Sequence, residues 1–179
     1  RMAEAPGVGP ASGVLEIGPG IGVLTRELAV RAGKVVAVEL DQRLLPVLEE
    51  TLRDAGRVKV VHGDVMKLDL AALLKEEFRD MPVAVCANLP YYITSPIIMG
   101  LLESRLPFTT ITVLVQKEAA QRLCARPGSR ECGAVTLAVQ YYAEAKILFP
   151  VSRGSFLPAP KVDSAVMQLQ IRRGPPCRV

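Results

Sequence analysis

The sequence has no tryptophan, few aromatic residues and a single histidine, and these scarcities exclude several kinds of site. The four cysteines, Cys86, Cys124, Cys132 and Cys177, form no C-x-x-C pair, and only His62 could join them as a metal ligand. We therefore expect no zinc site and no other metal centre. Their spacing does not resemble a disulfide framework either.

Long apolar runs are absent as well. No segment approaches the roughly 20 apolar residues that cross a bilayer, and none has the basic flank, apolar core and cleavage site of a secretory signal. Half of the 179 residues are hydrophobic and 22% are charged, which is typical of one well-packed domain and not of a disordered chain. We expect a monomeric cytoplasmic protein with no membrane partner. Its net charge of +4 is compatible with a nucleic-acid partner.

What the sequence does contain is a regular alternation of apolar strands and amphipathic helices. The strands are continuous apolar runs, which is typical of a parallel sheet covered on both faces. The last two strands have no convincing helix between them, so we expect a hairpin that puts an antiparallel strand at the end of the sheet. Strands are predicted at 14–17, 34–40, 58–61, 82–87, 109–115, 145–149 and 165–171, and helices at 23–32, 41–52, 70–78, 95–103, 118–124 and 134–142. Residues 1–12 are predicted to be a loop, 13–172 the domain, and 173–179 the start of a linker.

A glycine-rich turn follows the first strand and opens a helix. Its glycines, Gly18, Gly20 and Gly22, let the backbone approach a ligand closely, and Glu16 lies two residues ahead of them. A dinucleotide fingerprint would need a further glycine where Val23 stands. The spacing instead suits S-adenosylmethionine, which has no pyrophosphate to place on a helix N-terminus.

Acidic residues end the next two strands. Glu39, with its neighbour Leu40, lies 17 residues beyond Gly22, where a carboxylate can accept hydrogen bonds from both ribose hydroxyls. Asp64 follows the third strand and could accept from an adenine amine, while Val65 packs on the ring. Taken singly, the glycines could form an ordinary tight turn, Asp64 could cap a helix, and Glu39 could be a solvated strand end. Their succession after three strands favours an adenosine-shaped site that holds S-adenosylmethionine and its product S-adenosylhomocysteine.

The segment Asn88-Leu89-Pro90-Tyr91 follows the fourth strand, in line with these turns. The Asn88 side-chain oxygen and the Leu89 carbonyl could accept hydrogen bonds from an adenine amine. These bonds would direct the lone pair of the amine nitrogen at a methyl group. Pro90 stiffens the turn, and Tyr91 could stack on the base. The alternative is an ordinary strand-to-helix turn. Phe156, in a proline-rich loop, could cover the other face of the base or simply be a core residue.

Taken together, these motifs resemble the ribosomal RNA adenine dimethyltransferase family. The resemblance covers roughly residues 13 to 172 and includes Leu-Glu-Ile-Gly-Pro-Gly-Ile-Gly, Val-Glu39-Leu-Asp, Gly-Asp64-Val, Asn88-Leu-Pro-Tyr and Phe156-Leu-Pro-Ala-Pro-Lys-Val-Asp-Ser. It implies a Rossmann-like class I methyltransferase fold: a mostly parallel seven-stranded sheet, helices on both faces and an antiparallel strand near one edge. It also implies that Gly18, Glu39, Asp64 and Asn88 contact the cofactor, while Tyr91 and Phe156 bracket the target adenine.

Within the family, the sequence is most similar to the bacterial branch that dimethylates two adjacent adenosines near the 3′ end of small-subunit (16S) ribosomal RNA. We therefore expect ribosomal RNA or the immature small subunit as partner, and a role in ribosome biogenesis. Members carry a Gln-containing segment before the first strand and a small C-terminal helical domain. Neither is present here, so the chain resembles a catalytic core with weak activity or none.

Several alternatives remain open at this point. The large-subunit branch, which confers macrolide resistance, typically has Ile where Leu89 stands. Glutamine and DNA-adenine methyltransferases share the fold but have a proline there, and a nicotinamide dehydrogenase would need the missing glycine. A family member acting mainly as a non-catalytic assembly or transcription factor is a further possibility. Basic residues that could contact RNA phosphates are Arg122, Arg126, Arg130, Arg153 and Lys161.

Overall fold

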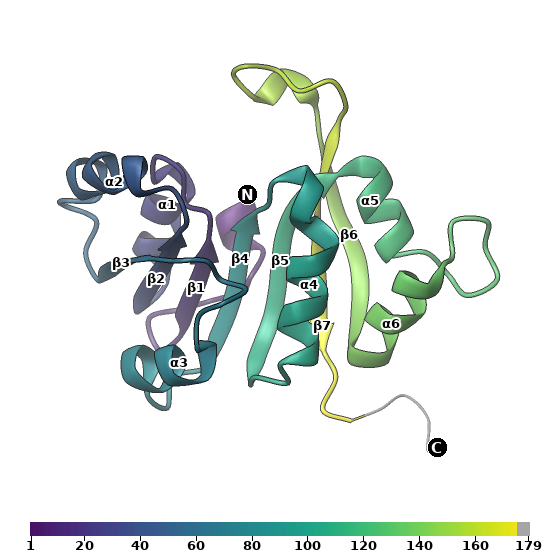
Figure 1. Cartoon of the computed structure of the whole chain (residues 1–179), viewed down its shortest axis with the longest axis horizontal. Coiled ribbons are helices and arrows are strands. Elements are labelled where there is room, and N and C mark those ends of the chain that lie inside the picture. Colours follow the sequence, from purple (N-terminus) through teal and green to yellow (C-terminus); the bar gives the residue numbers. More distant parts are fainter. Residues whose placement is uncertain (175–179) are drawn as a thin grey trace.

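A computed structural model describes residues 1–174 of the chain. Its centre is one seven-stranded sheet with the order β3-β2-β1-β4-β5-β7-β6 (Figure 1). The strands are β1 Gly13–Ile17, β2 Lys34–Glu39, β3 Val58–His62, β4 Val83–Asn88, β5 Phe108–Gln116, β6 Ala143–Val151 and β7 Ser164–Ile171. The α/β class and the mostly parallel seven-stranded sheet are confirmed.

Six α-helices connect the strands among the described residues. They are α1 Val23–Arg31, α2 Leu45–Thr51, α3 Leu70–Phe78, α4 Thr94–Glu103, α5 Lys117–Leu123 and α6 Ala134–Tyr142. Four short 3-10 turns complete the elements: η1 Met2–Glu4, η2 Gln42–Leu44, η3 Tyr91–Ile93 and η4 Arg153–Ser155. The predicted bounds of α3 and α6 are those observed.

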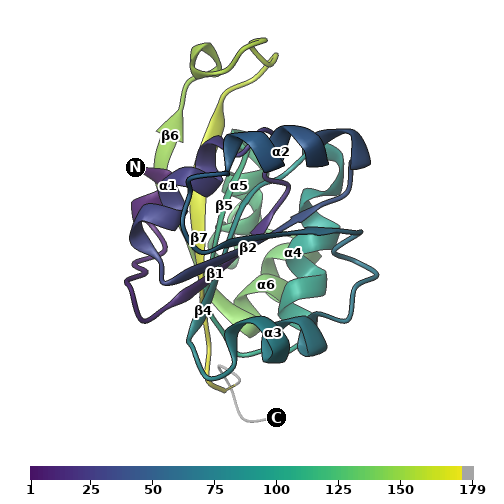
Figure 2. The ribbon, with the colours of Figure 1, turned by 90° about the vertical axis from the view of Figure 1, so that its left-hand side faces the viewer.

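The two faces of the sheet are covered by different helices, because successive strand residues point to opposite sides. One face carries α3, α4, α5 and α6 on the larger of two apolar clusters. The other carries η1 and α1 on a smaller cluster that includes Val14, Leu28 and Cys86. Figure 2, seen from the end of the molecule that carries β3, separates α1 on one side from α4 and α6 on the other. Helices on both faces are thus confirmed.

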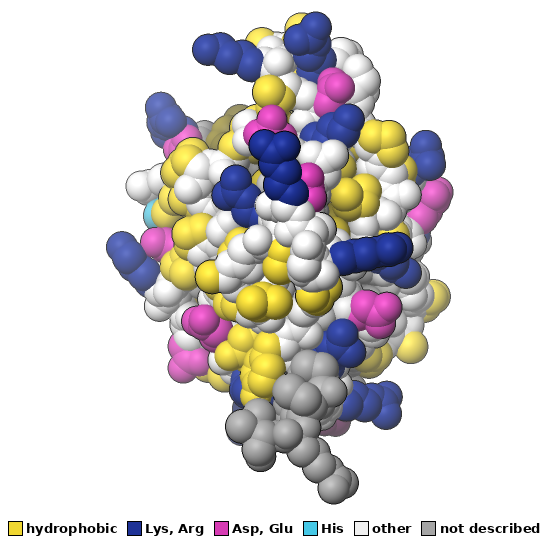
Figure 3. Space-filling view, turned by 90° about the vertical axis from the view of Figure 1, so that its right-hand side faces the viewer, with side chains coloured by type: hydrophobic (Ala, Val, Ile, Leu, Met, Phe, Trp, Pro, Cys, Tyr) yellow, Lys and Arg dark blue, Asp and Glu magenta, His cyan; other side chains and the backbone are white. Residues whose placement is uncertain are grey.

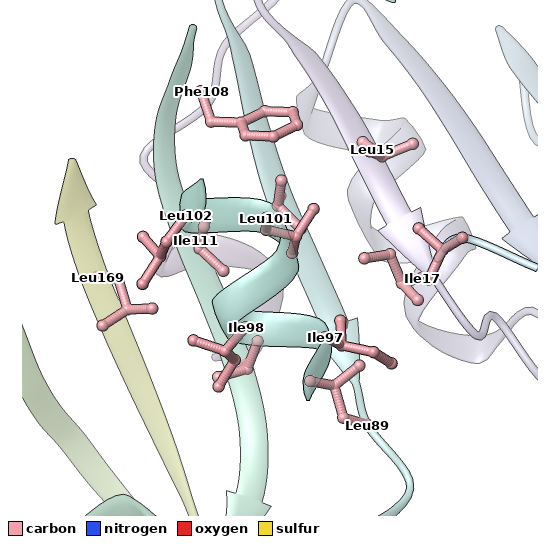
Figure 4. Packing of buried hydrophobic residues seen from close by; sticks show 14 of the residues in the cluster. Leu15, Ile17, Leu89, Ile97, Ile98, Leu101, Leu102, Phe108, Ile111 and Leu169 are labelled. Carbon is pink, nitrogen blue, oxygen red and sulfur yellow. The ribbon is translucent and has the colours of Figure 1, made fainter. Parts of the chain in front are cut away.

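Of the helices on this face, α4 contributes the most buried residues to the larger cluster. Its residues Ile97, Ile98, Leu101 and Leu102 are at most 4% exposed. Figure 4 shows them between side chains of the sheet, with Leu89 beneath Ile97 at the start of the helix. Because Leu89 is 2% exposed, the turn after β4 is anchored in the core by its own side chain.

Two elements differ from the sequence prediction. The helix predicted over 41–52 is divided into η2 and α2, because Pro46 in the first turn of α2 has no N–H to bond the preceding turn. The antiparallel strand is β7, which lies between β5 and β6, so the edge strand β6 runs parallel to β5. The prediction of an antiparallel strand near one edge is confirmed. The prediction that this strand lies at the end of the sheet is wrong.

The N-terminal segment, predicted to be a loop, is packed against the sheet. It contains η1, and Ala3 is 5% exposed. The Gln168 side chain donates to the Ala5 carbonyl at 2.6 Å, and the Arg1 guanidinium lies 4.5 Å from the centre of the Phe149 ring. Residues 175–179, which include Cys177 and most of the predicted linker, lie outside the described residues.

Among residues 1–174, no helix is both long and apolar enough to pass through a bilayer.

The approach of Gly33 to the N-terminal segment gives a stability prediction. A Cβ on Gly33 would lie 2.0 Å from the Pro10 carbonyl oxygen, so Gly33→Ala should force the backbone apart and cost about 1–3 kcal/mol of unfolding free energy. Gly9→Ala is the matched control, because a Cβ there meets nothing within 4 Å. Urea unfolding measures both variants, and equal stabilities would contradict the packing described.

Candidate active site

The carboxyl ends of three parallel strands meet at one edge of the sheet. Ile17 of β1 pairs with Val38 of β2 on one side and with Ala87 of β4 on the other. The next residue, Gly18, donates its N–H to the Val38 carbonyl at 3.0 Å. A Cβ on Gly18 would lie 3.8 Å from the Asn88 carbonyl oxygen. The glycine turn, the end of β2 and the start of the Asn88 turn are therefore neighbours.

The glycine turn needs glycine for its backbone shape. Gly18, Gly20 and Gly22 have φ values of +69°, +59° and +88°, in the left-handed region. Gly22 is the N-cap of α1, and a Cβ there would lie 3.0 Å from the Leu52 side chain. Gly22 thus serves the turn and the packing of α2, whereas Gly18 and Gly20 face the cleft described below.

Glu39 ends β2, is 6% exposed and fixes the glycine turn. One carboxylate oxygen accepts from the Gly20 N–H at 3.2 Å, and the other accepts from the Asp41 N–H at 2.8 Å. A carboxylate oxygen has two lone pairs, so each retains capacity for a further donor. The arrangement leaves Glu39 able to hold two hydroxyls while it also orders the turn.

Beside Glu39, the ends of β2 and β3 present apolar and acidic groups. Leu40 is 61% exposed, although it is a large apolar side chain. Asp64 accepts from the Met66 N–H at 3.0 Å through one oxygen, and Lys67 lies 3.7 Å from the other. Val65 is buried in the larger cluster. An exposed leucine, a half-exposed carboxylate and a firmly packed valine together can accommodate a flat heterocycle with an amine.

A cleft of about 480 Å³ opens in front of the glycine turn. Its walls include Glu16, Gly18, Gly20 and Asn88, together with Arg1, Met2 and Ala3 from the N-terminal segment. Glu39, Leu40, Asp64 and Val65 do not line this cleft. They belong to the neighbouring strand ends, connected to it through the bond between Glu39 and Gly20.

Glu16 is the unusual group of the cleft. It is 1% exposed, and one of its oxygens has no hydrogen-bond partner among residues 1–174. Burial raises the pKa of Glu16 to about 7, with a further rise from Glu39, while the Thr25 hydroxyl offsets part of the increase. A buried carboxylate with one unpartnered oxygen in a cleft wall is suited to a cationic ligand group.

The turn after β4 presents polar groups at the same edge. Asn88 is exposed, whereas Leu89 is buried and donates its N–H to the Leu114 carbonyl at 3.3 Å. Neither the Asn88 side chain nor the Leu89 carbonyl has a hydrogen-bond partner within the described chain. Tyr91 is 39% exposed, and its hydroxyl lies 3.2 Å from the Ser164 hydroxyl.

Phe156 lies in the loop 152–163 between β6 and β7, which projects from the body of the molecule (Figure 2). Its side chain is half-buried, and among residues 1–174 its ring does not stack on that of Tyr91. The link between the two is indirect, because Tyr91 contacts Ser164 at the end of that loop. Bracketing of a base by Tyr91 and Phe156 therefore remains a prediction.

Sequence reasoning missed two parts of this site. The first three residues line the cleft, but a Gly- and Pro-rich segment gives no periodic signal of packing. The role of Ser164 leaves no local signal, since its partner Tyr91 lies 73 residues away in the sequence. Within residues 1–174, no three His, Cys, Asp or Glu side chains gather as metal ligands would.

The raised pKa of Glu16 gives a prediction for stability against pH. The folded state binds this proton more tightly than the unfolded state does, so the stability it contributes is complete below pH 4.5 and is lost as the pH rises to about 7. The loss amounts to roughly 3 kcal/mol. Denaturant unfolding should show that Glu16→Gln removes this decline.

The control for that measurement is Glu49→Gln, which neutralises an exposed carboxylate on α2. It should keep the decline of the parent chain. A Glu16→Gln variant whose stability follows the same pH curve as the parent would show that Glu16 is not the titrating group.

The family model described as ribosomal RNA adenine dimethylase matches residues 3–179. The chain is 53% identical over 176 residues to "Ribosomal RNA small subunit methyltransferase A" of Shouchella clausii, covering 98% of this chain, and 52% identical over 176 residues to the protein of that name from Bacillus licheniformis. It spans 60% of the length of each of these two relatives.

Two solved structures are similar over nearly the whole chain. A dimethyladenosine transferase from Plasmodium falciparum has a TM-score of 0.82 at 31% identity, covering 96% of this chain and 60% of that one. The 23S rRNA methyltransferase ErmE also has a TM-score of 0.82, at 36% identity, covering 100% of this chain and 69% of that one. The fold is thus that of Rossmann-like methyltransferases, and the chain belongs to the ribosomal RNA adenine dimethylase family.

Proposed function

We propose that this chain is the catalytic domain of an S-adenosylmethionine-dependent enzyme that methylates the exocyclic amine of adenosines in small-subunit ribosomal RNA. The product would be two adjacent dimethyladenosines near the 3′ end, made during ribosome biogenesis in the cytoplasm. The observation that carries the proposal is the position of Asn88, which lines the cleft together with Glu16 and the glycine turn and is followed directly by the free carbonyl of Leu89.

The residues at this edge fit S-adenosylmethionine. Glu16, buried and with one unpartnered oxygen, would hold the α-ammonium group, and the turn at Gly18 and Gly20 would receive the methionine portion without a Cβ in the way. Glu39 would accept from the ribose hydroxyls. Asp64 would accept from the adenine amine, with Leu40 and Val65 against the ring. When bound, the cofactor supplies an electrophilic methyl group.

The chain's own part in the chemistry is to orient a weak nucleophile. The lone pair of an adenine amine is conjugated with the ring. The Asn88 side-chain oxygen and the Leu89 carbonyl would accept its two hydrogens and draw the nitrogen toward tetrahedral geometry. Because Leu89 is anchored in the core, its carbonyl is held before the base arrives. Tyr91 would stack on the base.

The identities favour the small-subunit branch over the large-subunit branch. The relatives named for the small subunit are 53% and 52% identical to this chain, whereas ErmE, named for 23S rRNA, is 36% identical. Leu89 is also the residue expected of the small-subunit branch at that position.

The charge distribution supports an RNA surface on the C-terminal half. Residues 1–103 carry 11 basic residues (lysine or arginine) and 14 acidic residues. Residues 104–179 carry 11 basic and 4 acidic residues. Every ion pair in the described chain joins residues between 1 and 77. Between residues 104 and 174, the lysines and arginines have no acidic partner within 4 Å and could therefore contact phosphates. Figure 3 faces the side with α5, α6 and β6, where Lys and Arg side chains extend from the projecting loop down the molecule.

Removal of the Asn88 amide tests the proposed chemistry. Asn88→Ala should lower methyl transfer from tritiated S-adenosylmethionine to immature small subunits by about 100-fold or more, because one of two acceptors is lost. Its thermal unfolding should stay that of the parent, since Asn88 is exposed. The control Gln170→Ala removes an exposed amide near the C-terminal end of β7. It should retain activity. Turnover of Asn88→Ala within a factor of two of the parent would exclude Asn88 from the chemistry.

Paired charge deletions test the proposed RNA surface. Arg126→Ala with Arg130→Ala should weaken binding to ribosomal RNA and reduce the dependence of log affinity on log salt by about 1–2. Arg53→Ala with Arg57→Ala removes the same charge from exposed positions in the N-terminal half and should leave that slope unchanged. Filter binding across a salt series gives both slopes. The same slope for both double variants would argue against this surface.

A further inference from the structure

A single hydrogen bond joins the Asn88 turn to the far end of the chain. The Tyr91 and Ser164 hydroxyl oxygens are 3.2 Å apart, and 73 residues separate them in sequence. Ser164 is fully buried at the first position of β7. Within residues 1–174, Tyr91 is the only hydrogen-bond partner of the Ser164 hydroxyl, which would otherwise be an unsatisfied buried group.

The rest of the Tyr91 segment is already fixed through its backbone. The Pro90 carbonyl accepts from the Ile93 N–H and from the Thr94 hydroxyl, both at 3.2 Å. This closes the η3 turn and sets where the Tyr91 side chain starts. The ring can still rotate about its own side-chain bonds, however, because Tyr91 is 39% exposed. The bond to Ser164 holds the other end of the ring.

Ser164 is itself held rigidly at the base of the loop that carries Phe156. It pairs with Gln116 of β5. The preceding residue, Asp163, accepts from the Lys117 N–H at 3.0 Å through its carbonyl and from the Arg153 N–H at 2.9 Å through its carboxylate. The two ends of the loop 152–163 are thus tied together next to the Tyr91 hydroxyl.

We infer that Ser164 is a positioning residue that acts through Tyr91: its hydroxyl sets the plane of the ring on which the target adenine stacks. This inference rests on the proposed function, because it needs a base at Tyr91. A ring fixed at both ends loses little entropy when a base stacks on it, and it presents the amine to Asn88 in one orientation. Ser164 would also keep the loop that carries Phe156 in register with that ring.

A double-mutant cycle on the chain tests the inference. The four proteins are the parent, Ser164→Ala, Tyr91→Phe and the double variant, and the assay measures kcat and KM for methyl transfer to immature small subunits. Each single variant should lower kcat about fivefold, the value expected for one neutral hydrogen bond, with KM for S-adenosylmethionine unchanged. The double variant should be no slower than either single variant, because both remove the same bond. Ser104→Ala, which deletes a hydroxyl at the end of α4 bonded to the Leu101 carbonyl, should keep full activity.

A merely structural role for Ser164 gives different results. In that case Ser164→Ala would lower kcat by the same factor with or without Tyr91→Phe, or would leave kcat unchanged, and either result overturns the inference. Unfolding free energies of the same four proteins report separately whether the hydrogen bond between Tyr91 and Ser164 forms. Additive effects of the two substitutions on these free energies would also overturn the inference. If the parent chain transfers no methyl group while the unfolding cycle shows coupling, the proposed function fails, and the inference fails with it.

Discussion

Parallel pairing of β1 between β2 and β4 is the constraint on which the rest of the site depends. It brings Ile17, Val38 and Ala87 to the same level, so the residues that follow them leave the sheet together. No single strand end has enough groups to bind a nucleoside and orient a nucleophile. Three adjacent ends supply a glycine turn, a carboxylate and a pair of free acceptors within one small region. In open α/β sheets such an edge is where ligands bind.

Most functional groups at this edge are held in place by contacts within the fold. Leu89 anchors the acceptor turn beneath α4, Glu39 is tied to Gly20 and Asp41, and Tyr91 is tied to Ser164. Glu16 is the exception, because its burial raises the pKa to about 7 and leaves one oxygen without a partner. That arrangement disfavours the charged folded state in the absence of a cationic ligand. The burial of Glu16 therefore carries a cost that the proposed cofactor would relieve.

The order of the elements and the site at the strand ends could be predicted because both have local signals. Apolar runs mark the buried strands, and the glycine turn, Glu39, Asp64 and the Asn88 turn each follow one of them. The position of β7 inside the sheet could not be predicted, since pairing between distant strands leaves no local signal. The packing of residues 1–5 and the contact between Tyr91 and Ser164 were missed for the same reason. Pro46 did carry a local signal for the division between η2 and α2, but the apolar stripe around it obscured that signal.

Methylation of adenosine amines in small-subunit ribosomal RNA is the proposed function of this chain. The most direct measurement is mass spectrometry of nucleosides from immature small subunits, and separately from large subunits, after incubation with the chain and S-adenosylmethionine. The account predicts dimethyladenosine at two adjacent positions in small-subunit RNA and none in large-subunit RNA. Methylation confined to large-subunit RNA, or methyl groups found only on protein, would contradict it.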